Sequence, residues 1–444
     1  MRMNPCRWLL LLPLTLATSC ALQSGSGDAS WLFVAQDVTL SGNMPADPAK
    51  RANDQTTFDE YSWKTMIALC WPVDINASRG VPLKPNSAEA FKNANKSDGS
   101  PSAPVVWSSY LTAADLFNVG VTPPAWSDKS VKIGRPLKFT NADFEKLPAD
   151  SDAFDEAFGG PLIDKNGNYT TYNIYFNETM YSQTRADKWY LKENLPAVPK
   201  AGDPPSTDGF RFDLGSIEMK GSWRPMTKSD DQTKYYVRMA NLPTSTGAQI
   251  VPMGLVGLHI AVKTKFRSQW LWATFEQVDN VGKKGASYNK CNIKQPGPEN
   301  GNEGGYSRKP NTIPAGKAPP YPAHAKPVLV SRVVPILPAT AELNTRYRKA
   351  LAGTVWENYE LIVTNWPTAT SKQALPQPPE VRTFDPNTYK AKMAGDPVPA
   401  FAANTTMETY FQQHSCIQCH YHAATNGTDF SWAVFNRAWT LPKK

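Results

Sequence analysis

The alternation of hydrophobic and polar residues predicts a β-sheet in the middle of the chain. Residues 212–225 alternate, with isoleucine and methionine on one face and charged side chains on the other. Residues 234–242 repeat this pattern, which predicts a second strand of the same kind. Residues 254–264 and 269–280 are almost free of charge until their ends, which is typical of strands that are buried on both faces.

Short helices are predicted before and after these strands in the sequence. Residues 51–72 place Thr57 and Glu60 in the spacing of a capping box, ahead of an apolar run. A second short helix is predicted over residues 104–117. Residues 340–362 recover a helical spacing of apolar positions, which predicts a longer helix there.

A hairpin and two long connections complete the predicted architecture. Residues 161–176 carry Asn-Gly between two β-prone flanks, which predicts the hairpin. Residues 292–327 and 366–403 are rich in proline and predict long surface connections. The chain is therefore predicted to be of the α+β class, with a β-rich central body, flanking short helices and a helical segment near the carboxyl end.

The first twenty residues, MRMNPCRWLLLLPLTLATSC, predict a bacterial-type export signal. Arg2 and Arg7 supply its positive charge, and the apolar stretch that follows is too short to span a bilayer. The stretch ends in Ala-Thr-Ser-Cys, which resembles the lipobox in which the cysteine becomes lipidated, here Cys20. Ordinary cleavage near Ala21 is the alternative.

Composition and charge then limit the partners. A hydrophobic content of 41% with 14 tryptophans predicts a folded, globular protein. The net charge of +8 is modest, and no basic block is interleaved with aromatic residues, so nucleic acid is excluded as a partner. Contact with a membrane is expected only through the lipid anchor.

Two of the six cysteines belong to the leader, and the other four form two pairs. Cys70 and Cys291 are an even pair in an oxidising compartment, which makes them a candidate disulfide. Two buried free thiols are the alternative. Cys416 and Cys419 belong instead to a motif.

The motif CIQCH, which contains Cys416, Cys419 and His420, has the Cys-x-x-Cys-His pattern of covalent haem attachment. Two thiols add to the two vinyl groups of the porphyrin, and the adjacent histidine reaches the iron. A thioredoxin-like redox pair would need a βαβ setting, and a zinc site would need a second Cys pair. Export of the chain also favours haem, since haem is attached outside the cytoplasm.

The motif is predicted to end a helix over residues 405–420, which a Thr405–Glu408 capping box would begin. No methionine follows His420 that could serve as the sixth iron ligand. Three nearby side chains lie too close along the chain to reach the other haem face, namely Met407, His414 and His422. The sixth ligand is therefore expected from the upstream body, or is absent.

Four upstream residues are candidates for this sixth ligand: Met219, Met253, His259 and His324. His259 is preferred because it stands in an otherwise apolar strand. A core histidine bonded to a carboxylate such as Glu218 or Glu276 is the alternative.

Several charged residues interrupt strands that otherwise have the pattern of a core. They are Glu218, Lys220, His259, Lys263, Glu276 and Asp279. Buried charges are expensive unless paired, so these residues are expected to meet one another, either as a catalytic or metal site or as a structural ion network. The neighbouring tryptophans Trp223, Trp270 and Trp272 either line a pocket or belong to the core.

Together, these segments resemble a family of exported bacterial proteins described as cytochrome c family proteins. The segments that carry the resemblance are residues 61–72, 104–110, 161–169, 215–224, 256–264, 269–280, 355–368 and 403–420, followed by DFSW. The resemblance implies one covalent haem on a large body that is not itself a cytochrome fold. Cys70 stands where such sequences often have asparagine, so the disulfide is not implied by the family.

The sequence predicts four parts: a lipoprotein-type signal peptide over 1–19, a tether over 20–50, the β-rich body over 51–370 and a haem c segment over 371–444. The expected function is electron transfer by a monohaem c-type cytochrome, with a redox protein as partner. Its expected location is the periplasm or the outer surface of a bacterial membrane.

Two other functions stay open. One is a haem-dependent oxidoreductase, peroxidase- or oxygenase-like, with an open distal site near Glu218, His259 and Glu276. The other is a binding lipoprotein in which the haem is a sensor or a structural staple.

Overall fold

Residues 38–444 form one compact unit in the computed structural model. The structure describes residues 37–137, 160–196, 210–244, 247–282, 286–288, 326–368, 397–412, 414–425 and 427–440. Cys20, Cys291 and His324, and with them the predicted leader, lie outside these residues.

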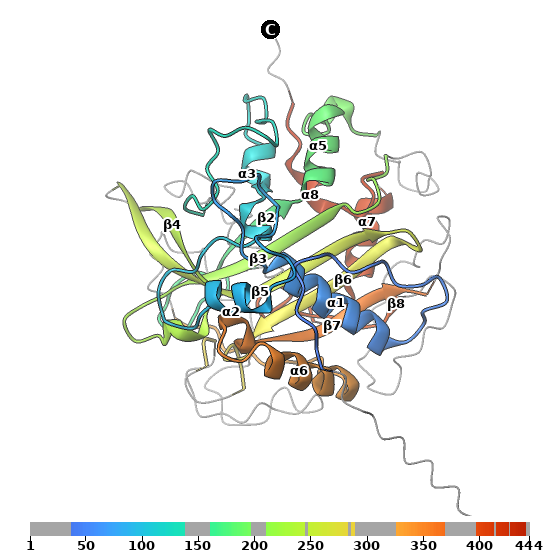
Figure 1. Cartoon of the computed structure of the whole chain (residues 1–444). Helices are drawn as coiled ribbons and strands as arrows, with labels where there is room; N and C mark the ends of the chain where they lie inside the picture. The colour runs from blue at the N-terminus through green and yellow to red at the C-terminus, as the bar shows by residue number, and fades with distance from the viewer. Residues whose placement is uncertain are drawn as a thin grey trace, which may run out of the picture. The chain divides into compact units, whose positions relative to one another are not determined.

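An antiparallel sheet organises the described part of the chain (Figure 1). Its eight strands are β1 (Leu111–Thr112), β2 (Thr171–Phe176), β3 (Ile217–Pro225), β4 (Val237–Thr244), β5 (Gly247–Thr264), β6 (Arg267–Gln277), β7 (Tyr359–Pro367) and β8 (Pro397–Val398). The order is β1-β2-β3-β5-β6-β7-β8, and β4 also pairs with β5. Every strand pair is antiparallel.

Helices α1 (Gln55–Leu69) and α6 (Pro338–Ala350) pack against the sheet and against each other (Figure 1). Trp63 of α1 stacks on Tyr347 of α6 and meets Phe275 of β6 edge-on, each at a ring-centroid distance of 5.0 Å. Its Nε1 donates to Asn344 Oδ1 at 3.0 Å, so the buried indole N–H is paired. These contacts lie in the main hydrophobic core.

The remaining helices are short. They are α2 (Ala88–Ala94), α3 (Ala113–Leu116), α5 (Glu178–Ala186), α7 (Cys416–Thr425) and α8 (Trp432–Arg437), with 3-10 turns at Trp107–Ser109, Lys192–Asn194, Gln232–Lys234 and Val355–Asn358. None of the helices in the described residues is both long and apolar enough to cross a membrane. The predicted α+β class is confirmed.

The predicted helix over residues 340–362 is wrong in its second half. Helix α6 ends at Ala350, and the chain turns at Gly353, whose φ of 82° is accessible to glycine at little cost. From Tyr359 the sequence YELIVTNWP forms strand β7 between β6 and β8. Its aromatic and β-branched side chains pack in the sheet, which overrides the helical spacing.

Two other local predictions are corrected. Asp54, not the Thr57–Glu60 box, caps α1, because its side chain accepts the Thr57 N–H at 2.8 Å. The segment over residues 104–117 forms a 3-10 turn, the short strand β1 and one turn of helix α3 instead of a single helix. The Asn-Gly turn is present, with a bridge between Ile163 and Tyr169.

Candidate functional site

The second face of the sheet carries a polar stripe across its central strands. The register places Lys220, His259 and Thr274 side by side on β3, β5 and β6. Residues that alternate with these along the strands, such as Leu258 and Phe275, face the other way and belong to the main core. The polar stripe is covered by residues 397–440, here called the C-terminal segment.

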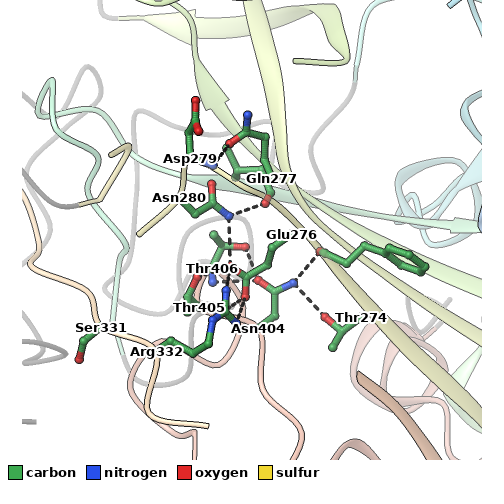
Figure 2. Close-up of polar contacts among 12 residues, drawn as sticks. Thr274, Glu276, Gln277, Asp279, Asn280, Ser331, Arg332, Asn404, Thr405 and Thr406 are labelled. Carbon is green, nitrogen blue, oxygen red and sulfur yellow. Dashed lines mark hydrogen bonds and ion pairs between the residues drawn. The ribbon is translucent and has the colours of Figure 1, made fainter. Parts of the chain in front are cut away.

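Glu276 fastens this segment to the sheet (Figure 2). Its fully buried carboxylate accepts both the N–H and the hydroxyl of Thr405, each at 2.6 Å. Arg332 donates to both carboxylate oxygens, at 3.1 and 3.0 Å. The paired charge and the hydrogen bonds together offset the desolvation of the buried carboxylate.

The residues on either side of Thr405 also bind the sheet. Asn404 Nδ2 donates to Thr274 Oγ1 and to the carbonyl oxygen of Phe275, each at 2.9 Å (Figure 2). The Thr406 hydroxyl lies 2.6 Å from Ser222 Oγ. Only glycine fits at position 257, because a Cβ there would collide with both hydroxyls.

Of the predicted charged cluster, Lys220 and His259 lie side by side on β3 and β5, and other members contact residues outside the cluster. His259 Nε2 lies 3.5 Å from Glu408 Oε2, Lys263 pairs with Asp429, and Glu218 accepts a hydrogen bond from Ser431 Oγ at 2.7 Å. Asp279 pairs with Lys234. Glu218, His259, Lys263 and Glu276 each contact a residue of the C-terminal segment. His259 contacts Glu408 in place of the expected Glu218 or Glu276.

Glu408 is the acidic residue that contacts His259. Burial alone would raise the pKa of Glu408, but His259, Lys220 and the N–H of Asn404 hold it below its usual value. The carboxylate is thus ionised at neutral pH. Sequence reasoning missed this role because it placed Glu408 in a helix cap.

The CIQCH motif begins a helix rather than ending one. The predicted helix over residues 405–420 is wrong: the chain turns between 405 and 412, and α7 starts at Cys416. Ser415 Oγ accepts the Gln418 N–H at 3.2 Å, and Gln418 Oε1 accepts the Ser415 N–H at 3.3 Å. This Ser-x-x-Gln capping box is visible in the sequence and would have found the helix start.

A backbone carbonyl and an aromatic ring contact the side chain of His420. Its Nδ1 lies 2.7 Å from the carbonyl oxygen of Phe430, and the Trp272 ring lies 4.1 Å away, centroid to centroid. The pKa of His420 is lowered to about 4, mainly by burial and also by the charges of His259 and Lys220, while the Phe430 carbonyl and Glu408 oppose this lowering. The imidazole is neutral at pH 7, and a bond from an Nδ1–H to the carbonyl leaves Nε2 as the unprotonated nitrogen.

Burial raises the pKa of both motif thiols, that of Cys419 to about 12 and that of Cys416 well above its usual value. Both are protonated at neutral pH, whereas a redox-active Cys-x-x-Cys pair needs a stabilised thiolate. The sheet is antiparallel and offers no βαβ setting in the described residues. Within those residues no group of three or more His, Cys, Asp and Glu side chains is placed to hold a metal ion.

The candidates for a sixth iron ligand separate onto the two faces of the sheet. Met219 and Met253 are fully buried in the main core, away from the motif. His259 lies on the stripe under the C-terminal segment, close enough to His420 to affect its pKa. Met407, which is too close to the motif in sequence, is also in the main core.

The remaining predicted residues are divided in the same way. Trp223 lies in the main core, whereas Trp270 and Trp272 belong to a second cluster with Ile417 and Phe430, so the three tryptophans do not line one pocket. The Cys70 thiol is fully buried, and no disulfide is present among the described residues. Its proposed partner is not among them.

The donor set at the start of α7 fits a covalent haem c. Two thiols stand one helical turn apart, the following histidine is neutral, and its Nδ1 already has a carbonyl partner, as iron-ligating histidines usually have. The chain was compared with protein-family models, with curated proteins and with solved structures, and none of the three comparisons gave a match. The arrangement of the residues themselves therefore carries the functional argument.

Proposed function

We propose that this protein is an exported monohaem c-type cytochrome that transfers electrons. The haem would be bound covalently at Cys416 and Cys419, with His420 as the proximal ligand of the iron. The hydrogen bond between His420 Nδ1 and the Phe430 carbonyl, at 2.7 Å, is the observation that supports this best. It orients the imidazole and leaves its other nitrogen, Nε2, without a proton, as an iron ligand requires.

A bound haem would supply an iron centre that accepts and releases single electrons. The protein's own residues contribute orientation and exclusion of water. The Trp272 ring covers one side of His420 at 4.1 Å, and Trp432 Nε1 donates to the carbonyl oxygen of Cys419 at 3.1 Å. The backbone of the motif is also held, because Asn365 Oδ1 accepts the Ile417 N–H at 3.1 Å.

Covalent attachment is tested first. The chain is expressed together with a haem-maturation system, separated on a denaturing gel and stained for haem peroxidase activity. We expect a stained band that a Cys416→Ala/Cys419→Ala double variant lacks. Cys70→Ala is the matched control, since it removes a thiol outside the motif, and it should keep the stain. Wild-type protein that is folded but carries no covalent haem would contradict the proposal.

The coordination of the iron distinguishes electron transfer from the oxidoreductase alternative. Visible spectra of the reduced protein are recorded before and after addition of carbon monoxide. For a simple electron carrier with both axial positions filled, we expect no prompt spectral shift. A prompt shift would support the open distal site instead.

His259 is the proposed sixth ligand, since it is the described candidate on the same side of the sheet as His420. Replacing it by alanine should convert a low-spin spectrum to a high-spin one. His414→Ala serves as the control. His414 is not proposed as an iron ligand, and its ring stacks on Phe411 at a ring-centroid distance of 3.7 Å. An unchanged spectrum in His259→Ala removes His259 from this role.

The proposal includes export and anchoring through a lipid on Cys20, with a redox protein as the partner. Mass spectrometry of the mature amino terminus tests this. We expect a diacylglyceryl-cysteine at position 20, and a soluble product from Cys20→Ala. Cys6→Ala is the control and should leave the lipid in place. An unmodified terminus near Ala21 would remove the anchor and keep the haem proposal.

A further inference from the structure

A buried ion pair stands behind the loop that faces His420. Lys263 of β5 places its Nζ at 2.7 and 2.8 Å from the two carboxylate oxygens of Asp429, and both side chains are almost fully buried. Asp429 Oδ2 also accepts the Phe212 N–H at 2.8 Å. Burial raises the pKa of Asp429 and the charge of Lys263 opposes this.

The loop backbone between α7 and α8 has an uncommon conformation. Asp429 and Phe430 have φ values of 44° and 70°, in the left-handed region that side chains with a Cβ rarely adopt. Such residues persist where the surrounding contacts hold them. The Lys263–Asp429 pair and the Asp429–Phe212 bond are contacts of this kind, and the hydrogen bond from Ser431 to Glu218 is another.

The loop conformation has a direct consequence at the motif. It points the Phe430 carbonyl oxygen to 2.7 Å from His420 Nδ1. A carbonyl can only accept a hydrogen bond, so this contact requires the proton on Nδ1 and leaves Nε2 free of one. Rotation of the Phe430 peptide would remove that requirement.

We infer that Lys263 and Asp429 are positioning residues for His420. Their ion pair holds the Phe430 peptide in place, and through it fixes the tautomer, the ring orientation and the basicity of the histidine. The inference rests on the proposed function, because an axial ligand is what needs this control. A stabilising role alone explains the pair less well, since buried ion pairs are often no better for stability than apolar side chains of the same volume.

The tautomer of His420 is measured first, in the full chain without haem, by NMR of protein labelled with ¹⁵N-histidine. Wild type is expected to hold the Nδ1–H form. Asp429→Asn and Lys263→Met are each expected to shift the tautomer ratio by roughly tenfold toward Nε2–H, the equivalent of one lost hydrogen bond. Lys263→Arg keeps the charge and should retain most of the Nδ1–H form.

Lys234→Met is the matched control for the loss of a lysine. It removes the Lys234–Asp279 pair, whose nitrogen–oxygen distance is 3.3 Å, at a more exposed place on the same molecule. Its tautomer ratio should equal that of wild type. Folded Asp429→Asn and Lys263→Met proteins with an unchanged ratio would overturn the inference, and so would a wild type in the Nε2–H form.

The reduction potential of the haem-loaded protein gives a second test that does not depend on the folding of the haem-free variants. Asp429→Asn removes a negative charge and Lys263→Met a positive one, so a purely electrostatic effect would move the potential in opposite directions. Loss of the Nδ1–H bond weakens the donor character of His420, so both variants should raise the potential. Shifts of opposite sign would overturn the inference.

These tests separate the two claims. The tautomer is measured without haem, so it can support the positioning role when haem attachment fails. The haem stain, in turn, can support attachment when the tautomer ratio does not change.

Discussion

The two faces of the central sheet are covered in different ways, although the same strands carry both. On one face, α1 and α6 pack apolar and aromatic side chains such as Trp63 and Tyr347 against Phe275. On the other, the C-terminal segment is attached through buried polar groups such as Glu276 and Lys263. The first kind of contact tolerates small shifts, whereas the second is directional.

The difference teaches what each face contributes. Burial of apolar area supplies most of the free energy of folding and does not depend on exact alignment. Buried hydrogen bonds and ion pairs add little net stability, yet each one has only one good geometry. We therefore expect the apolar face to determine the stability of the protein, and the polar face to determine where His420 is held.

The largest effect is expected on the apolar face. Trp63→Ala should lower the free energy of unfolding by about 3–5 kcal/mol, because it leaves a cavity between α1, α6 and β6. Urea unfolding monitored by circular dichroism measures this. Trp63→Phe keeps the ring stack but loses the bond to Asn344, and it should cost less. Equal losses in the two variants would contradict the packing argument.

A second, more local effect is expected at Glu276. Glu276→Gln removes the carboxylate charge that pairs with Arg332 and weakens the bonds to Thr405, at a cost of about 3 kcal/mol. Hydrogen exchange should increase in residues 403–409 before it increases in β5. Glu342→Gln, on the exposed face of α6, is the control and should change neither. An equal increase in exchange over the whole chain would mean that the C-terminal segment does not open separately from the rest of the fold.

Ser431 should have a smaller effect. Its Oγ donates to Glu218 and accepts the Val434 N–H as the cap of α8. Ser431→Ala should lower stability by about 1–2 kcal/mol and loosen the loop that carries Phe430. Ser431→Thr keeps the hydroxyl and should restore most of the loss. If alanine and threonine behave alike in urea unfolding, the hydroxyl does not carry the contact.

The smallest effect concerns pH. Glu408 has a lowered pKa in the folded state, so it adds stability above the pKa of the unfolded chain and loses that contribution as the pH falls through the folded pKa. Wild-type stability in urea should therefore fall below about pH 4.5, the usual pKa of glutamate, more steeply than that of Glu408→Gln. Parallel pH profiles would show that the ionised form of Glu408 contributes nothing to stability.

The strands were predictable because their patterns are local. Residues 212–225, 254–264 and 269–280 alternate or are continuously apolar, and the structure places β3, β5 and β6 there. The capping motif of α7 was also visible in Ser415 and Gln418, although the Thr405–Glu408 spacing was the one first interpreted as a cap. Two similar motifs in one segment cannot be ranked without the surrounding contacts.

The partners of the buried charges were not predictable. Glu218, His259, Lys263 and Glu276 share one stripe of the sheet, so pairing among themselves was the simplest expectation. A segment that follows more than a hundred residues later supplies partners for all of them. No local pattern specifies contacts across such a separation in sequence.

The sequence by itself determined the donor set of CIQCH, the α+β class and the positions of the central strands, because motif spacing and periodicity are properties of a short stretch of chain. The tertiary structure alone decided that a carbonyl of Phe430 faces His420 and that Lys263 and Asp429 stand behind it. The Lys263–Asp429 contact joins residues brought together only by docking of the C-terminal segment onto the sheet, and the geometry of that docking depends on the whole fold. The contact between Phe430 and His420 lies within that segment and depends on the conformation of the loop between α7 and α8.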